Sequence, residues 1–198
     1  MIQYILKEND RYSIAEQAQM AIEGGCGWIN LHLPGLDEPA LRDALAPEVV
    51  DMCRDAGVFL TIDDRPETAR ELGLHGVRYT SAGIPSASSP AQLREEMGPE
   101  AIIGIETADP SSTPAMAAAD IDFVCMPAHF DSAQRRRFTE TVRSLGVMLP
   151  IVAQGDVTAD TIKDFLTEGA SGVAVSDFIT TADDPVAAMA ALLDKIAQ

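Results

Sequence analysis

The amino-acid sequence alternates about eight times between a short apolar run and a longer segment with helical periodicity. The apolar runs are rich in Val, Ile or aromatic residues, as strands are when both of their faces are buried. The predicted strands are Ile2–Leu6, Trp28–Leu31, Phe59–Ile62, Gly76–Tyr79, Ile102–Ile105, Phe123–Cys125, Pro150–Ala153 and Gly172–Val175. Strands that alternate with helices pair in parallel through right-handed crossovers. The sequence therefore predicts an α/β protein with a parallel sheet.

The segments between the strands carry signals for the start and the end of helices. Ser13 and Glu16 have the spacing of a capping box, and Gly24 is expected as the left-handed residue that ends the same helix. Ser89-Pro90 and Asp184-Pro185 each place a capping residue before a proline at the first helical position. These signals favour a helix after each strand.

The chain length limits how such units can be arranged. The 198 residues allow roughly 25 residues per unit, which is close to the lower size limit of an eight-unit barrel. The prediction is a compact single-domain (β/α)8 TIM barrel that spans residues 1–198. In such a barrel the carboxyl ends of all strands meet at one face, the mouth, so residues that are far apart in sequence line one pocket.

The formal net charge of −17 argues against binding to nucleic acid or to an anionic membrane surface. The three cysteines lack metal-type spacing, and the sequence has no signal peptide and no apolar stretch of membrane-spanning length. We therefore expect a reduced, cytoplasmic protein without nucleic-acid or membrane partners. A homodimer is the default expectation for its assembly.

Residues at the ends of the predicted strands are the candidates for a binding site at the mouth. The expected substrate pocket contains Asn30, His32, Asp63, Thr80 and Glu106. The other residues at these strand ends are Lys7, Asn9, Asp64, Arg65, Arg78, Ser81, Thr107, Met126, His129, Gln154, Gly155, Asp156, Ser176 and Asp177. The alternative is a polar rim that faces water and binds nothing.

Two neighbouring carboxylates, Asp63 and Asp64, follow the third predicted strand. Carboxylate oxygens are suitable ligands for a hard divalent cation such as Mg²⁺. Adjacent residues of a strand point in opposite directions, so both side chains can bind one ion only after a local bend. The alternative is that one carboxylate caps the next helix and pairs with Arg65.

The ends of the seventh and eighth predicted strands are where barrels of this kind often bind phosphate through backbone N–H groups. Gly155 lets a ligand approach the backbone closely, and Ser176 adds a hydroxyl donor. Asp156 and Asp177 follow directly, and a carboxylate about 4 Å from a phosphate repels it by about 4 kcal/mol per charge pair at intermediate dielectric. Either these carboxylates point away as helix caps, or the site no longer binds phosphate.

Two histidines, His32 and His129, are expected at the mouth, whereas His75 precedes the fourth strand and belongs to the opposite end. A histidine at the mouth can transfer protons near neutral pH, although an isolated histidine is more often a structural hydrogen-bonding residue. Arg135 follows the sixth strand and can reach over the mouth toward an anion. The alternative for Arg135 is a solvated helix surface.

Segments along the chain occur in an order and spacing typical of one family. They are 53–65, which ends in Asp63-Asp64-Arg65, and 71–78, 98–105, 122–130, 150–155 and 169–176. Together they make the chain resemble the superfamily of thiamine phosphate synthases and TenI-type thiazole tautomerases, which are compact eight-fold barrels. The resemblance covers nearly the whole length and is strongest from Asp51 onward.

The resemblance implies a barrel enzyme of thiamine phosphate biosynthesis that handles a small thiazole- or pyrimidine-type phosphate. Such a synthase joins a pyrimidine methyl pyrophosphate to a thiazole phosphate, and Mg²⁺ and cationic groups stabilise the departing pyrophosphate. By position, the resemblance implies Asp64 as a Mg²⁺ ligand. The implied pyrophosphate contacts are Ser132 and Arg135, and the implied thiazole phosphate contacts are Gly155, Val175 and Ser176.

Several family features are changed in this chain. The family's Gln-x-Arg-x-Lys after the second strand appears as Asn30-Leu31-His32-Leu33-Pro34, so two cations are lost. The family's second metal aspartate falls at or near Ala82-Gly83, and its serine after the fifth strand is Glu106. Losing one charge-stabilising contact typically costs roughly a hundredfold or more in rate. The changes therefore predict inefficient synthase chemistry.

The tautomerase branch needs a proton carrier beside a bound thiazole phosphate and no pyrophosphate contact. In that branch a histidine lies in the loop after the sixth strand, and His129 lies one residue from that position. Taken together, the two branches make His129, Asp64 and Arg135 the candidate catalytic residues.

These observations leave three hypotheses. The first is an enzyme of this family in thiamine phosphate biosynthesis, either a transferase or a tautomerase. The second is a non-catalytic binding or scaffold protein, motivated by the missing cations and the added acids. The third is a metal-dependent barrel enzyme that uses Asp63, Asp64, Glu106 and Asp156 on an unrelated substrate. Likeness of fold alone does not choose among them.

Overall fold

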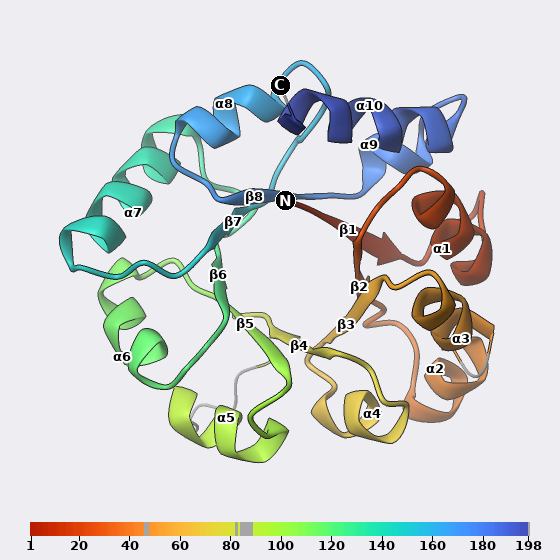
Figure 1. Ribbon diagram of the computed structural model, residues 1–198, viewed down its shortest axis with the longest axis horizontal. Helices are drawn as coiled ribbons and strands as arrows, with labels where there is room; N and C mark the ends of the chain where they lie inside the picture. Colours follow the sequence, from red (N-terminus) through yellow and green to blue (C-terminus); the bar gives the residue numbers. More distant parts are fainter. Residues whose placement is uncertain (46–47, 82, 84–88, 198) are drawn as a thin grey trace.

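The computed structural model describes residues 1–45, 48–81, 83 and 89–197. Within these residues, parallel strands close into a barrel in chain order, with β8 hydrogen-bonded to β1, and helices form an outer ring (Figure 1). The strands are β1 (Ile2–Lys7), β2 (Trp28–His32), β3 (Phe59–Asp63), β4 (Gly76–Tyr79), β5 (Ile102–Glu106), β6 (Phe123–Cys125), β7 (Ile151–Ala153) and β8 (Gly172–Val175). The predicted (β/α)8 barrel is confirmed.

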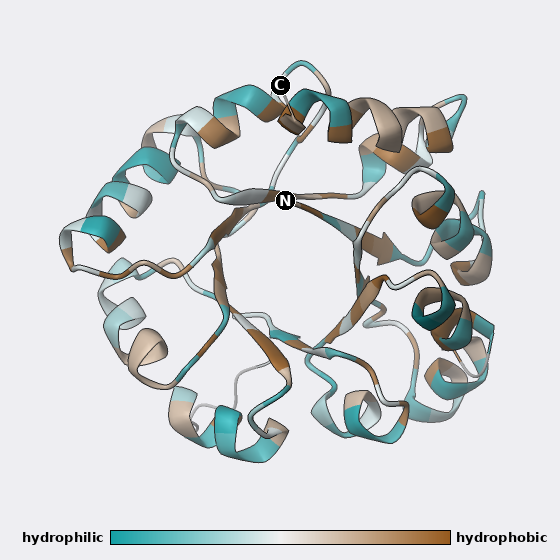
Figure 2. Ribbon diagram, viewed as in Figure 1, coloured by the Kyte–Doolittle hydropathy of each residue, from teal (hydrophilic) through white to brown (hydrophobic). Residues whose placement is uncertain are grey.

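The outer ring contains helices between all neighbouring strands and after the last one. They are α1 (Ile14–Glu23), α2 (Glu38–Leu45), α3 (Glu48–Asp55), α4 (Pro66–Glu71), α5 (Pro90–Met97), α6 (Thr113–Ala118), α7 (Ser132–Ser144), α8 (Ile162–Thr167), α9 (Asp177–Thr180) and α10 (Pro185–Ala197), with a 3-10 turn η1 at Pro110–Ser112. Figure 2 shows strands that are mostly apolar and helices that mix apolar and polar residues. The capping box at Ser13 and Glu16 is present, and Ser89 caps α5 in the same way.

The end of helix α1 differs from the prediction. Gly24 keeps a helical φ of −74°, and Gly25, at φ 85°, takes the left-handed conformation. A Cβ atom on Gly24 would lie 2.6 Å from the Cβ atom of Met189 in α10. Gly24 therefore serves the close approach of two helices, and its prediction as the left-handed residue was wrong.

Side chains that point into the barrel form a separate small cluster. Its buried members are Ile5, Trp28, Phe123, Cys125, Val152 and Ala174. The rings of Trp28 and Phe123 meet edge to face with centroids 4.8 Å apart, and the Phe123 ring covers Gly104 so closely that a Cβ there would lie 2.1 Å from it. The barrel interior is thus a packed core rather than a channel.

The three cysteines, Cys26, Cys53 and Cys125, are free and buried. Burial raises the pKa of the Cys125 thiol to about 12, so this thiol is not a ready nucleophile. In the described part of the chain, no helix combines the length and the apolar character needed to cross a membrane.

Candidate active site

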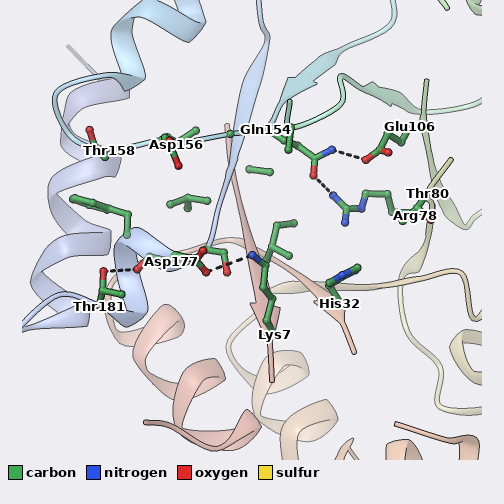
Figure 3. A pocket seen from close by; sticks show the side chains of 18 residues that line it. Lys7, His32, Arg78, Thr80, Glu106, Gln154, Asp156, Thr158, Asp177 and Thr181 are labelled. Atoms are coloured by element: carbon green, nitrogen blue, oxygen red, sulfur yellow. Dashed lines mark hydrogen bonds and ion pairs between the residues drawn. The ribbon is translucent and has the colours of Figure 1, made fainter. Parts of the chain in front are cut away.

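A cavity of about 930 Å³ lies at the carboxyl ends of the strands (Figure 3). Residues of β1, β2, β4, β5 and β8 line it, together with residues that follow β6 and β7. The lining residues are Ile5, Lys7, His32, Arg78, Thr80, Glu106, Ala128, Gln154, Gly155, Asp156, Val157, Thr158, Ala174, Val175, Ser176, Asp177, Phe178 and Thr181. Residues from Lys7 to Asp177 therefore converge on one pocket, as closure of the barrel predicts.

The predicted site residues fall into three groups. Those that line the cavity are His32, Thr80, Glu106, Gly155, Val175 and Ser176. Asn30 and Asp63 are buried, and Asp63 and Asp64 line a smaller pocket that shares His32 with the cavity. Ser132 and Arg135 line another pocket with residues of α8, and His129 is exposed and packs edge to face on Phe130 at 5.4 Å.

The carboxylate of Asp63 contacts three side chains, those of Asn30, His32 and Arg78. Its Oδ1 accepts from Asn30 Nδ2 at 2.8 Å and from Arg78 Nε at 2.7 Å. Its Oδ2 accepts from Arg78 Nη2 at 2.5 Å and lies 2.7 Å from His32 Nδ1. Burial raises the pKa of Asp63, but the hydrogen bonds from Arg78 and His32 more than offset it, so that pKa lies below its usual value.

The sequence alternative in which one of the two aspartates caps a helix and pairs with Arg65 is wrong. Arg65 precedes α4, which has no side-chain cap, and its guanidinium lies 3.4 Å from Glu38 and donates to the carbonyl of Leu36. Asp63 is instead opposite Arg78 in the β3–β4 register. An inward-facing arginine directly across from an inward-facing aspartate forms a buried pair.

A chain of hydrogen bonds extends from Arg78 across the barrel. Arg78 Nη1 donates to Gln154 Oε1 at 2.9 Å, and Gln154 Nε2 donates to Glu106 Oε2 at 2.8 Å (Figure 3). Ser81 Oγ donates to the other oxygen of Glu106 at 3.0 Å. These hydrogen bonds link β4 and β5 to the residue that follows β7. They fix the position of the Glu106 carboxylate at the cavity.

Asp64 has a backbone φ of 55°, and Thr80 holds its side chain. The carboxylate accepts from the Thr80 backbone N–H at 2.8 Å and from Thr80 Oγ1 at 2.6 Å. Burial raises the pKa of Asp64, and the bonds from Thr80 offset only part of that rise. A Cβ on Gly83 would lie 1.8 Å from Asp64 Oδ1, so Asp64 occupies the space beside this position, while Ala82 lies outside the described residues.

We expect Asp64→Asn to keep the free energy of unfolding within about 0.5 kcal/mol of the wild type. Asparagine tolerates the left-handed backbone, and its amide can accept from the Thr80 N–H and donate to the Thr80 hydroxyl. Asp64→Ala loses both bonds and should cost about 1–3 kcal/mol. Urea unfolding compares the two variants, and equal losses would contradict the role given to Thr80.

The far side of the cavity combines possible phosphate contacts with carboxylates. Gly155 has a φ of 138° and lines the cavity together with Ser176. Asp156 and Asp177 line the cavity as well. The alternative in which both carboxylates lie away from the pocket is therefore not what the structure has. The ammonium group of Lys7 lies 3.4 Å from Asp177 Oδ1 (Figure 3) and reduces the negative charge there.

The side chain of Arg135, on α7, contacts residues near α7 and α8. Its Nε donates to Glu168 Oε2 at 2.5 Å, its Nη1 donates to the Phe130 carbonyl at 2.7 Å, and its guanidinium lies 4.1 Å from the Phe165 ring centroid. Burial raises the pKa of Glu168, but the bond from Arg135 brings it below its usual value. The role of Arg135 as a pyrophosphate contact stays a prediction, and its guanidinium already has three partners.

Within the described ranges, no group of three or more His, Cys, Asp and Glu side chains is placed to hold a metal ion. Sequence reasoning also missed several lining residues, among them Thr158, Phe178 and Thr181. Thr158 lies in the loop after β7, and Phe178 and Thr181 lie within and directly after the short helix α9, beyond the strand ends on which the prediction relied. A loop and a four-residue helix have no clear periodic signal in the sequence.

The cavity at the carboxyl ends of the strands lies where barrel enzymes bind their substrates. A family model described as thiamine monophosphate synthase matches residues 2–179. The chain is 31% identical to the thiamine-phosphate synthase of Phocaeicola vulgatus over 94% of this chain and 93% of that protein. It is 30% identical to the thiamine-phosphate synthase of Natronomonas pharaonis over 93% of this chain and 88% of that protein.

The solved structure of thiamine phosphate pyrophosphorylase from Pyrococcus furiosus matches with a TM-score of 0.83 at 19% identity, covering 98% of this chain and 95% of that one. At this identity the likeness supports the fold. The match of the family model shows that the chain belongs to the thiamine monophosphate synthase family. The resemblance inferred from the sequence is thereby confirmed, as is the expectation of an enzyme, and the scaffold and unrelated-enzyme hypotheses are not favoured.

Proposed function

We propose that this chain is a thiamine phosphate synthase, which joins a pyrimidine methyl pyrophosphate to a thiazole phosphate and releases pyrophosphate. The observation that carries the proposal is the family match over residues 2–179. Identity of 31% to a protein named thiamine-phosphate synthase, over nearly the full length of both chains, supports it further. The cavity at the mouth has room for two small substrates at about 930 Å³.

The thiazole phosphate is proposed to bind at the ends of β7 and β8. Gly155 lets the phosphate approach the backbone, and Ser176 supplies a hydroxyl donor. Val175, the last residue of β8, lines the cavity directly before Ser176. Lys7 offsets part of the charge of the nearby Asp177. The pyrophosphate is then proposed to bind nearer β1 and β2, where Lys7 and His32 are side by side in register. This proposal departs from the expected contacts Ser132 and Arg135, which line a neighbouring pocket.

Magnesium is the cofactor expected from the family, and Asp64 is the expected ligand. Mg²⁺ is often bound through one or two carboxylates together with substrate phosphates. The Asp64 carboxylate already accepts two hydrogen bonds from Thr80, and burial raises its pKa. The described residues therefore do not fit a magnesium ion held by the protein alone.

The tautomerase branch has weaker support as a second function. Its expected proton carrier, His129, is exposed and is not one of the residues that line the cavity. The relatives from Phocaeicola vulgatus and Natronomonas pharaonis are both named thiamine-phosphate synthase. The synthase reaction is therefore the one proposed.

Incubation of the enzyme with both substrates and Mg²⁺ tests the proposal. We expect thiamine phosphate and pyrophosphate to appear in equal amounts, detected by chromatography, and neither to appear when one substrate is omitted. Absence of product at high enzyme concentration would overturn the proposed function.

A pair of variants of Ser176 tests the position of the thiazole phosphate. Ser176→Glu places a carboxylate in the proposed phosphate site, and repulsion of about 4 kcal/mol at intermediate dielectric predicts a rise of at least about 100-fold in the KM for thiazole phosphate. Ser176→Gln is the matched control, because it adds the same bulk without charge. Equal KM values for the two variants would place the phosphate elsewhere.

We further propose that residues 1–198 act as one domain and that the enzyme is a cytoplasmic homodimer. Its proposed partners are small phosphate-bearing substrates rather than nucleic acid or membranes. The net charge of −17 supports the exclusion of nucleic acid. Sedimentation velocity of the purified chain checks the dimer.

A further inference from the structure

Two side chains with a fixed positive charge, Lys7 and Arg78, are among the described residues that line the cavity. The Arg78 guanidinium is 3% exposed and donates to Asp63 and to Gln154, so its charge and its donors are already used. The Lys7 side chain is 42% exposed. Of these two cations, Lys7 is therefore the one that an anion in the cavity can reach.

The ammonium group of Lys7 is paired with a carboxylate that also lines the cavity. Its Nζ lies 3.4 Å from Asp177 Oδ1, and this is the hydrogen bond that the Lys7 side chain makes within the described ranges. An ammonium group has three N–H donors, so further donors are left for a ligand. The Asp177 side chain is 79% exposed, and an ion pair that faces solvent contributes little to stability. The pair can therefore open at a small cost.

Lys7 lies between the two anion sites proposed above. It is the last residue of β1, which is hydrogen-bonded to β8 on one side and to β2 on the other. Asp177 directly follows Ser176 after β8, whereas His32 is the register partner of Lys7 in β2. Figure 3 shows the Lys7 side chain between Asp177 and His32. Because the lysine stem has four flexible carbons, its ammonium group can change partner without movement of the backbone.

We propose that Lys7 leaves Asp177 to bind the substrate pyrophosphate, so that Asp177 is an internal competitor of the substrate; the inference rests on the proposed function. In the free enzyme Asp177 holds the ammonium group beside β8. In the substrate complex the ammonium group donates to a pyrophosphate oxygen, and the Asp177 carboxylate is left to water. When the bond from the pyrimidine methylene carbon to that oxygen breaks, both electrons stay on the oxygen. Lys7 keeps its proton and stabilises the added negative charge.

The difference in charge favours the exchange. A pyrophosphate carries several negative charges and a carboxylate carries one, so the ammonium group is attracted more strongly to the pyrophosphate at the same distance. Asp177 opposes binding in two ways, because it occupies the ammonium group and also repels the anion. Asp156 lines the same cavity but forms no ion pair in the described part of the chain, so it opposes binding by repulsion alone. This difference between the two carboxylates makes the inference testable.

Asp177→Asn should bind inorganic pyrophosphate more tightly than the wild type does. Calorimetry of the full chain in magnesium-free buffer should give a Kd that is lower by roughly five- to tenfold. Asp156→Asn is the matched control, because it removes the same charge from the same cavity without freeing Lys7, and it should lower the Kd by about twofold. An Asp177→Asn variant that binds pyrophosphate no more tightly than Asp156→Asn would overturn the inference.

Variants of Lys7 test the other half of the exchange. Lys7→Gln should raise the Kd for pyrophosphate by about tenfold or more and lower kcat by about 100-fold, because the contact strengthens as charge develops on the leaving group. Lys7→Arg keeps the charge and should restore most of the binding and of kcat. In the Lys7→Gln background, Asp177→Asn should gain no more affinity than Asp156→Asn, because no ammonium group is left to be freed. The full gain in that background would overturn the inference.

The binding measurement needs no turnover, so it separates failure of this inference from failure of the proposed function. An active wild type together with a Lys7→Gln variant of unchanged Kd and kcat would overturn the role of Lys7 and leave the proposed function standing. A wild type that forms no thiamine phosphate but shows the expected order of Kd values would overturn the proposed function and support the exchange of Lys7 between two anions.

Discussion

Replacing Arg78 with methionine should destabilise the barrel by about 3–5 kcal/mol at neutral pH. The side chains of Arg78 and Asp63 are only 3% and 5% exposed, and Arg78 makes two of the hydrogen bonds that Asp63 accepts. Methionine fills a similar space but leaves the buried carboxylate with Asn30 and His32 as its remaining partners. Urea unfolding at pH 7 measures the loss.

The loss in Arg78→Met should shrink as the pH falls. In the wild type the pKa of Asp63 is lowered, so its contribution to stability is present above the ordinary aspartate pKa of about 3.9 and is lost as the pH falls through the folded value. In the variant burial remains without the guanidinium, so the folded pKa of Asp63 rises, and protonation favours the folded state below that value. Unfolding free energies that differ by the same amount at about pH 7 and about pH 4 would contradict this account.

A double variant shows that the loss comes from an unpaired charge rather than from lost packing. Asp63→Asn combined with Arg78→Met removes both charges, and it should be more stable than Arg78→Met alone. A double variant that is less stable than the single one would assign the loss to the shape of the side chains.

The strands could be predicted from the sequence because each is buried on both faces and reads as a short apolar run. The observed ends of β1 and β7, for example, differ from the predicted ends by a single residue. The position of the pocket could be predicted from the barrel, because the carboxyl ends of parallel strands all lie at one face. The prediction of the strands and of the pocket needed only the composition of each segment and the order of the segments along the chain.

Pairs of residues were harder to predict, because they depend on register and on the packing of helices. Asp63 and Arg78 meet because β3 and β4 pair at that register, which the sequence does not state. Arg135 and Glu168 are 33 residues apart and meet only where α7 packs beside α8. The sequence indicates that Arg135 can reach over the mouth, but it does not show this partner.

Gly76→Ala should destabilise the protein by about 3 kcal/mol or more. Gly76 begins β4 and pairs with Ile102 at the start of β5. A Cβ at Gly76 would lie 1.8 Å from the Ile102 carbonyl oxygen, which is a backbone atom. Overpacking costs about 1–3 kcal/mol where side chains yield, but here relief of the contact requires the two neighbouring strands to separate.

Gly27→Ala is the matched control for this substitution. Gly27 directly precedes strand β2, and an added Cβ there meets no atom within 4 Å. Alanine should therefore be neutral or raise the unfolding free energy by up to about 1 kcal/mol, because it restricts the unfolded chain. In a closed barrel, separation of β4 from β5 also displaces Arg78 from Asp63 on one side and Glu106 from Gln154 on the other. Urea unfolding and the synthase assay should consequently both report a loss in Gly76→Ala, and a variant as stable and active as Gly27→Ala would show that the ring of strands tolerates a local gap.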